Sequence, residues 1–208
     1  AGTCPSATAT VQVQVKPTPL ANAGLDFEVC AQQVIAIGTP AEPGVSYTWM
    51  PSTGLDNPNT ANPQLTPLNV TQQAQTQAFL LNANLNGCIA TDTVKVLVKP
   101  VPVAGFPTPA AKCFRGNSFD FNAQGNYPPQ AVYEWDFGPW ATPNTGNTRS
   151  VTGVQYGATG NHPVSLKIEL DGCTSNVFTN NIQVLEMPVA NFTANKLEGC
   201  EPLPVLFE

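Results

Sequence analysis

The chain is poor in charge, and this scarcity excludes one class of partner. Of its 208 residues, 8 are Lys or Arg and 14 are Asp or Glu, so 11% are charged and the net charge is −6. An ordinary globular protein has about 25% charged residues. The few basic residues are scattered, whereas a protein that neutralises phosphates needs them clustered. We therefore expect no nucleic-acid partner.

Histidine, metal-binding motifs and long apolar runs are also lacking. His162 is the single histidine, and no Cys-x-x-Cys or Asp-x-Asp-x-Asp sequence occurs. Nothing in the spacing of the carboxylates requires the facing pair of a glycosidase. No apolar run approaches the ~20 residues of a membrane-spanning helix. We expect a protein that is not an enzyme, with no catalytic residues, no metal or other cofactor, and no direct membrane insertion.

The abundant residues indicate β structure. Threonine and valine are frequent, and 21 prolines and 16 glycines are spread along the chain. β-Branched side chains favour strands, and Pro or Gly at short intervals interrupts helices. The composition therefore predicts an all-β protein with almost no helix.

The six cysteines form two interleaved series, each with a period of about 85 residues. The series that we call the late cysteines is Cys4, Cys88 and Cys173, and the series that we call the early cysteines is Cys30, Cys113 and Cys200. A shared period indicates an internal sequence repeat.

The repeat predicts the organisation of the chain. Residues 18–100 and 101–187 are expected to be two full sandwich domains. Residues 1–17 are expected to be the last strand of a truncated preceding repeat, and residues 188–208 the first strands of a truncated following repeat. Adjacent repeats of the same chain are then the nearest partners of each domain.

Each late cysteine stands where a hairpin is expected. Asn86-Gly87 precedes one and Asp171-Gly172 precedes another, and both dipeptides favour a two-residue turn with positive φ. The sequence after Cys88 alternates apolar and polar residues up to Pro100, with Thr93 on the polar face. Period two with one apolar face is typical of a half-buried strand.

The cysteine pairing is expected to lie within each domain. Sequence alone does not fix the connectivity of six cysteines, but a bond that closes a domain must recur in every copy. This favours Cys30–Cys88 and Cys113–Cys173, and leaves Cys4 and Cys200 unpaired within the chain. The alternative is six free thiols in a cytosolic protein. Disulfides persist in oxidising compartments, so we expect an extracellular or cell-surface location.

Three tryptophans have different expected roles. Trp49 and Trp135 are one period apart and lie between cysteines. Cys…Trp…Cys within about 100 residues of short strands is typical of an immunoglobulin-like sandwich, in which the Trp packs in the core. The alternative for both is a sugar-stacking surface. Trp140 has no counterpart in the other repeat, so it is the candidate for surface contact.

One part of the second repeat resembles a known family. Tyr133–Gly138 (YEWDFG) resembles the Trp-Asp-Phe-Gly core motif of PKD (polycystic kidney disease) domains, and Tyr156–Leu166 resembles the Tyr-x-x-x-Gly-x-Tyr-x-Val-x-Leu strand pair of that family. Pro139-Trp140 and His162-Pro163 depart from the pattern. The resemblance implies tandem immunoglobulin-like (PKD-type) β-sandwich domains. With the cysteine pairing expected above, each domain has one intradomain disulfide bond.

The first repeat resembles a narrower group. Residues 18–100, through the runs 47–55 and 87–94, resemble the Ig/PKD-like repeats of giant surface proteins in Bacteroidetes-type bacteria. The resemblance implies long secreted adhesins, including those of gliding motility. Asp92-Thr93-Val94 resembles the O-glycosylation pattern of such exported proteins, which makes Thr93 a candidate modification site.

These observations predict a structural stalk segment of a long secreted or cell-surface adhesin or filament, which projects and bears load in adhesion or gliding. One alternative is a binding module that recognises a surface polysaccharide or protein through Trp140. Another is an accessory domain of a large secreted hydrolase.

Overall fold

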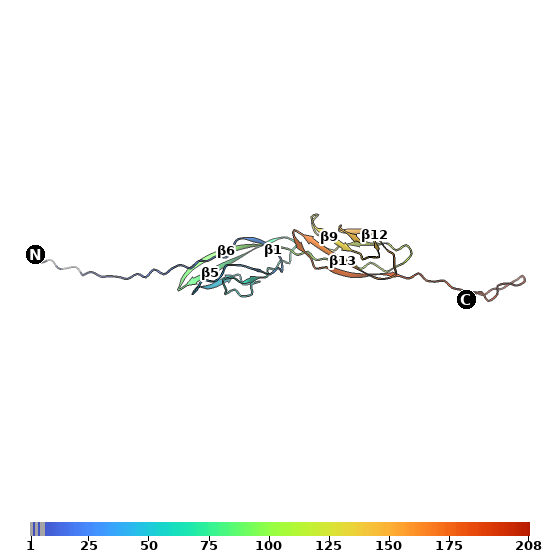
Figure 1. The fold of residues 1–208 in the computed structure, drawn as a ribbon, viewed down its shortest axis with the longest axis horizontal. Helices are drawn as coiled ribbons and strands as arrows, with labels where there is room; N and C mark the ends of the chain where they lie inside the picture. The colour runs from blue at the N-terminus through green and yellow to red at the C-terminus, as the bar shows by residue number, and fades with distance from the viewer. Residues whose placement is uncertain (1, 3, 5–6) are drawn as a thin grey trace. The chain divides into compact units, whose positions relative to one another are not determined.

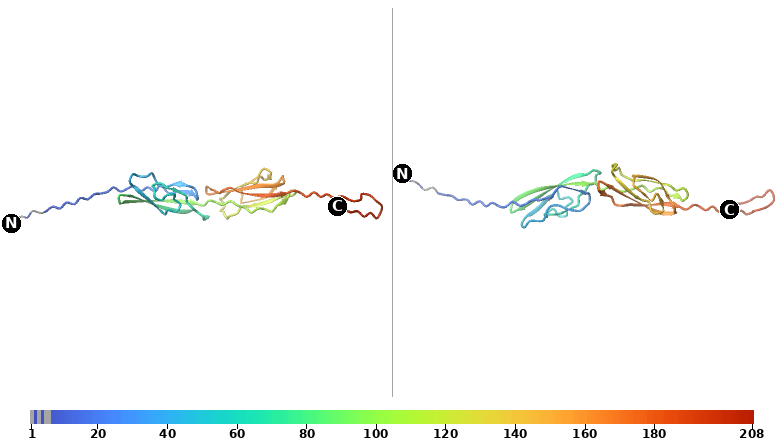
Figure 2. Two further views of the ribbon diagram at one scale, coloured as in Figure 1. Left: turned by 90° about the horizontal axis from the view of Figure 1, so that it is seen from below. Right: turned by 45° about the horizontal axis from the view of Figure 1, so that its top comes forward.

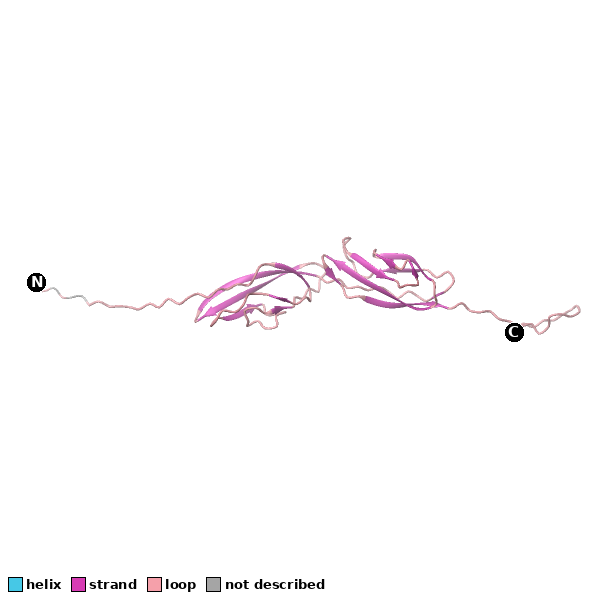
Figure 3. Cartoon of the chain, in the orientation of Figure 1, coloured by secondary structure: helices cyan, strands magenta, loops and turns pink. Residues whose placement is uncertain are grey.

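The all-β prediction is confirmed. The computed structural model describes residues 2, 4 and 7–208, and these residues form strands, turns and loops without any helix (Figures 1 and 3). That part of the chain accordingly contains no helix long and apolar enough to cross a membrane. The chain divides into two compact units: the first extends to Val101 and includes Asp171–Cys173, and the second comprises Pro102–Leu170 and Thr174–Glu208.

The first unit has a four-stranded sheet and a two-stranded sheet. Its strands are β1 (Phe27–Cys30), β2 (Ile35–Ala36), β3 (Ser46–Met50), β4 (Gln64–Leu65), β5 (Gln75–Leu85) and β6 (Cys88–Lys99). The sheet orders are β1-β6-β5-β3 and β2-β4. In immunoglobulin nomenclature these are A′-G-F-C and B-E, so the strand order is that of an immunoglobulin-like sandwich.

The β5–β6 hairpin is the longest feature of the first unit (green in Figure 2). Its two strands pair without interruption from Gln75 opposite Val98 to Leu85 opposite Cys88. Asn86 and Gly87 close it with φ values of 51° and 91°. Two consecutive positive φ values are the geometry that makes Asn-Gly favourable here, and the expected hairpin turn is confirmed.

The second unit has a three-stranded and a six-stranded sheet. Its strands are β7 (Lys112–Cys113), β8 (Phe119–Asn122), β9 (Val132–Asp136), β10 (Ala141–Thr142), β11 (Thr145–Gly146), β12 (Ser150–Tyr156), β13 (Gly160–Leu170), β14 (Cys173–Thr174) and β15 (Phe178–Leu185). The orders are β10-β12-β8 and β11-β9-β13-β15-β7, with β14 also paired to β13. These correspond to D-E-B and C′-C-F-G-A′.

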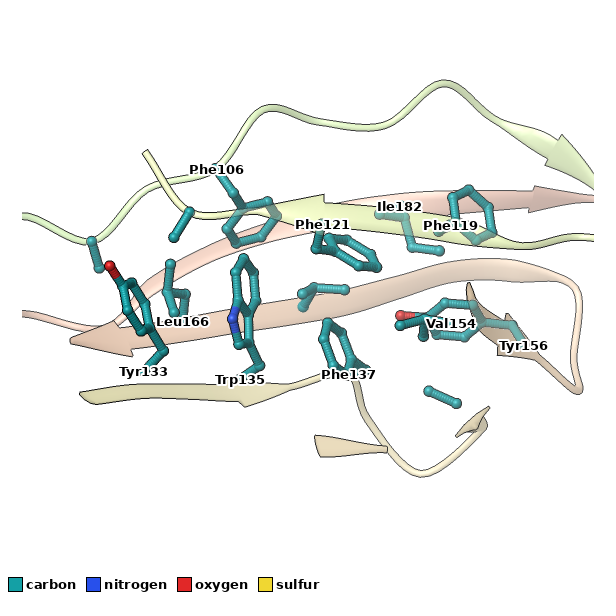
Figure 4. Packing of buried hydrophobic residues seen from close by; sticks show 14 of the residues in the cluster. Phe106, Phe119, Phe121, Tyr133, Trp135, Phe137, Val154, Tyr156, Leu166 and Ile182 are labelled. Carbon is teal, nitrogen blue, oxygen red and sulfur yellow. The ribbon is translucent and has the colours of Figure 1, made fainter. Parts of the chain in front are cut away.

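An aromatic cluster fills the core of the second unit (Figure 4). Trp135 projects from β9 toward Phe106 and Phe121, with ring centroids 5.1 and 5.8 Å away, and Phe137 stacks with it at 5.7 Å. Aromatic pairs at these separations add to the burial of apolar area. The first unit has a separate core around Trp49 and Phe79.

The segment 1–17, expected to be a strand, contains no strand in its described residues. Residues 7–17 make no ladder, and Val11, Val13 and Val15 are exposed. An isolated extended segment has no neighbour to supply its hydrogen bonds. Residues 102–111 also form no strand, although Phe106 is buried; this segment is rich in proline, which cannot donate to a ladder.

The expected cysteine pairing is wrong. The structure bonds Cys30 to Cys173, 143 residues apart, in place of Cys30–Cys88 and Cys113–Cys173. Cys88 and Cys113 carry free thiols, as do Cys4 and Cys200. Neither of the two domains expected from the sequence therefore has the closing bond predicted for it.

Candidate functional site: the cysteine ends of the sandwiches and the Trp140 loop

The early cysteines occupy the same position in both repeats. Cys30 ends β1, which runs parallel to β6 and places Cys30 opposite Lys99 at the end of that strand. Cys113 ends β7, which runs parallel to β15 and places Cys113 opposite Leu185. In each case the next residue continues the ladder: the Ala31 amide donates to the Lys99 carbonyl at 2.9 Å, and Phe114 to Leu185 at 2.8 Å.

The late cysteines occupy a second position common to both repeats. Cys88 follows Asn86-Gly87, and Cys173 follows Asp171-Gly172. Asp171 and Gly172 have φ values of 51° and 81°, so this turn has the same sign pattern as the first. Each late cysteine is thus the first residue after the turn that leaves strand F.

The early and late cysteines lie at opposite ends of each sandwich. This separation explains why neither predicted bond, Cys30–Cys88 or Cys113–Cys173, is present. Cys88 begins β6 and Cys30 lies beside its last residue, Lys99, eleven residues further on, which is about 36 Å at 3.3 Å per residue. Cys113 pairs with the end of β15 that faces Gly160, while Cys173 follows the far end of β13. A disulfide needs Cα atoms within about 7 Å.

The disulfide-bonded cysteines have defined neighbours. Cys173 is fully buried, and the Gly172 carbonyl lies 3.8 Å from the Cys30 sulfur. Glu28 and Lys99, on the paired strands β1 and β6, form an ion pair at 2.6 Å. The pairing of β1 with β6 holds Cys30 at the end of the sheet, and the disulfide bond joins it there to Cys173.

The free thiol of Cys88 also has defined neighbours. Its sulfur lies 4.0 Å from the carbonyl oxygen of Lys16, and the Lys16 ammonium donates to the Asn86 carbonyl at 2.9 Å. Lys16 is not among the site residues predicted from the sequence. The signal was available, because Lys16-Pro17 matches Lys99-Pro100 at a distance of 83 residues.

The tryptophans differ in burial. Trp49 and Trp135 are 1% and 2% exposed, and their indole nitrogens donate to the carbonyls of Thr60 at 2.9 Å and Thr148 at 2.8 Å. Trp140 is 61% exposed in the loop before β10, and its carbonyl accepts the Gly157 amide at 2.9 Å.

The candidate modification site is accessible. Thr93 is exposed on β6, between the half-buried Asp92 and the buried Val94. Asp92 is already engaged: one carboxylate oxygen accepts the Ala23 amide and the other accepts the Thr93 amide, both at 2.8 Å. Thr93 is thus accessible on the surface of β6, and its O-glycosylation remains a prediction.

Carboxylates elsewhere accept backbone amides. Asp26 accepts from Lys95, Asp120 from Gly153 and Asp136 from Gly138, at 2.8 to 2.9 Å. Across residues 2, 4 and 7–208, no three His, Cys, Asp or Glu side chains gather as metal ligands. His162 is buried against Tyr156, with its Nε2 2.9 Å from the Ala158 carbonyl oxygen. These side chains support local structure.

Comparison with known proteins gives no family. No protein-family model and no curated protein matches the chain. Among solved structures, the two immunoglobulin domains of DIP-gamma are 8% identical with a TM-score of 0.39, over 83% of this chain and 99% of that one. The fibronectin(III)-like modules of Clostridium thermocellum CbhA are 16% identical with a TM-score of 0.32, over 77% and 90%. The titin fragment I67–I69 is 10% identical with a TM-score of 0.34, over 79% and 64%.

Proposed function

We propose that this chain is a segment of a tension-bearing stalk in a long extracellular or cell-surface adhesin or filament built from tandem immunoglobulin-like (PKD-type) repeats. The observation that carries the proposal is the covalent connectivity. The bond between Cys30 and Cys173 closes a loop that contains residues 31–172. Most of both sequence repeats lies inside that loop.

A pull on the two ends of the chain follows the shortest covalent path. That path runs from the N-terminal segment to Cys30, crosses the sulfur–sulfur bond to Cys173, and continues to the C-terminal segment. The backbone from residue 31 to residue 172 is then not stretched while the sulfur–sulfur bond is intact. Tension therefore passes through β1, β14 and β15 and bypasses the strands from β2 to β13. A chain with most of its strands protected in this way is suited to holding two objects together.

The terminal strands provide a second line of resistance. In each unit the first and last strands are neighbours and run parallel: β1 with β6, and β7 with β15. A pull along such a pair loads its hydrogen bonds together, whereas a hairpin opens one pair at a time. This arrangement favours a mechanical role even after the disulfide is reduced.

Composition and sequence resemblance support the finer proposal. Disulfides persist outside the reducing cytosol, which favours an extracellular or surface location. Proline at the expected joints, such as Lys99-Pro100 and Met187-Pro188, stiffens the backbone between repeats. The sequence resemblance to Bacteroidetes-type adhesins supports a role of such a stalk in surface adhesion or gliding.

Single-molecule stretching tests the proposal. With handles at the two ends, the oxidised chain is expected to release about 500 Å less contour length than the reduced chain, because a separation of 143 residues spans roughly that length when extended. The variant carrying Cys30→Ser and Cys173→Ser is the matched control and should extend fully with or without reductant. Equal contour lengths in the oxidised and reduced wild-type chain would refute the proposal.

A second candidate function is a binding module, favoured by the exposure of Trp140. An exposed indole can stack on a sugar ring or anchor a protein contact. Binding to glycan arrays by the wild-type chain, its loss on Trp140→Ala and its retention on Val177→Ala, another exposed apolar residue, would support this role. Absence of binding in all three proteins would leave the stalk alone.

A further inference from the structure

The bonded cysteines and the free cysteines of the two full repeats occupy matching positions. Cys30 and Cys113 each end a strand parallel to strand G, and each is followed by an amide that continues the ladder. Cys88 and Cys173 each follow a two-residue turn with positive φ. The one bond present joins an early cysteine to the late cysteine of the next repeat along the sequence. Cys113 and Cys88 are the members of the same two classes that remain free.

Neither Cys88 nor Cys113 can form a disulfide bond within its own repeat. Their own-repeat partners lie about 36 Å away along the strands, and both of these partners, Cys30 and Cys173, are consumed by the existing bond. The geometry that permits the Cys30–Cys173 bond therefore leaves Cys113 and Cys88 without partners in their own repeats, so each is available to bond to a cysteine of another repeat.

An independent observation shows what belongs beside Cys88. Lys99 is the residue beside which Cys30 lies in the ladder, and Lys16 stands 83 residues before Lys99 in the same Lys-Pro context. The carbonyl oxygen of Lys16 is 4.0 Å from the Cys88 sulfur. An early cysteine paired with Lys16 as Cys30 is paired with Lys99 would therefore stand next to Cys88.

We propose that the cysteines form an interlocked series, in which the early cysteine of each repeat bonds to the late cysteine of the next repeat. Cys113 bonds to the late cysteine of a repeat that follows residues 101–187. Cys88 bonds to the early cysteine of a repeat that precedes residues 18–100. This inference rests on the tandem array of the proposed function and adds the identity of its covalent partners.

The chemistry is thiol–disulfide exchange. Each new bond joins two thiol sulfurs, which together lose two protons and two electrons. An oxidant of the disulfide class, such as oxidised glutathione or the disulfide form of a thiol oxidoreductase, accepts both and is cleaved to two thiols. One protein thiolate attacks the oxidant's disulfide, which releases one thiol of the oxidant and forms a mixed disulfide. The second protein thiolate then attacks the protein sulfur of that mixed disulfide, which forms the new bond and releases the oxidant's second thiol.

The test adds one repeat to the full chain. A second copy of residues 101–187 is inserted directly after residue 187, and the protein is refolded with reduced and oxidised glutathione, alkylated with N-ethylmaleimide and mapped by mass spectrometry without reduction. We expect two bonds, Cys30–Cys173 and a new one from Cys113 to the inserted copy of Cys173. The matched control, Cys113→Ser, should leave the inserted copy of Cys173 alkylated.

Each other result overturns the inference. Alkylation of Cys113 together with the inserted copy of Cys173, a bond between the two cysteines of the inserted repeat, or a bond between separate molecules would each contradict it, and so would the absence of Cys30–Cys173. The Cys30–Cys173 bond reports in the same sample that the repeats fold and that the buffer oxidises. Failure of the stretching experiment would leave this mapping result unaffected, so the two proposals fail separately.

Discussion

At the residue scale, the two buried tryptophans are tied to loops by their indole nitrogens. Trp49 donates to Thr60 and Trp135 to Thr148, although the loops differ in sequence. In the first unit the ring also packs closely on Gly38: a Cβ built on that glycine would lie 2.8 Å from the indole and 2.1 Å from the Ala61 carbonyl oxygen. Position and hydrogen bonding therefore both fix the ring.

We expect Trp49→Phe and Trp135→Phe each to lower the free energy of unfolding of the unit that contains it by about 2 kcal/mol, because a buried carbonyl loses its donor and the smaller ring leaves space. Urea denaturation followed by far-ultraviolet circular dichroism measures the change. Trp140→Phe is the control, since an exposed ring with no such bond should change stability by less than about 0.5 kcal/mol. Equal effects at the three positions would contradict the assignment.

Tyr156 predicts a dependence of stability on high pH. Its phenol is buried without a hydrogen-bond partner in the described part of the chain, and burial, with the nearby Asp136 charge, raises its pKa from 10 to about 12. Between these values the folded protein keeps a proton that the unfolded chain releases. Stability is therefore complete below pH 10 and falls as the pH rises through 12.

Urea denaturation at pH 9 and pH 11 measures this loss, and Tyr156→Phe should remove its share of the decrease. The variant should fold at least as well as the wild type at neutral pH, because it deletes a buried hydroxyl that has no partner. An unchanged pH dependence in Tyr156→Phe would show that another group is responsible.

At the element scale, the turns before the late cysteines depend on backbone conformation. A Cβ on Gly87 or Gly172 would meet no atom within 4 Å, so only their positive φ opposes substitution. We expect Gly87→Ala and Gly172→Ala each to lower the free energy of unfolding by about 1 kcal/mol. Gly157→Ala is the control, since its φ is not positive and its nearest contact is an ordinary 3.8 Å. Thermal unfolding of the three variants decides, and a larger loss at Gly157 would be inconsistent with this explanation.

The elements that local chemistry determines could be predicted from the sequence. The Asn-Gly and Asp-Gly turns, the aromatic strands of Trp49 and Trp135 and the alternating strand with Thr93 outward all follow from residue type and period two. The absence of strands in residues 7–17 and 102–111 could not be predicted in this way. Residues 102–111 bury Phe106 without a ladder, because prolines remove the donors that a strand needs.

At the scale of the whole molecule, the disulfide pairing shows the limit of a repeat argument. A bond inside each repeat recurs with the period of the sequence, but so does a bond from each repeat to the next. The period of the cysteines therefore does not distinguish Cys30–Cys88 from Cys30–Cys173. What distinguishes them is that early and late cysteines lie at opposite ends of strand G, which is a property of the assembled sheet.

Thiol counting separates the two pairings directly. Alkylation of the native chain followed by intact-mass measurement should label four of the six cysteines, Cys4, Cys88, Cys113 and Cys200. Pairing inside each repeat would leave two, Cys4 and Cys200. Prior reduction should raise the number to six in either case, which checks that the reagent reaches every cysteine. Labelling of two cysteines in the untreated protein would contradict the structure.

The position of the single bond also determines what a protease can achieve. A cut at any peptide bond between residues 31 and 172 opens the loop but leaves both fragments attached through sulfur. The nicked protein should migrate as one species in a denaturing gel and separate into two only when reductant is added. In an interlocked series, every peptide bond between the first and the last disulfide-bonded cysteine lies within at least one such loop. An exposed fibre of this kind would therefore stay in one piece after any single cleavage in that region.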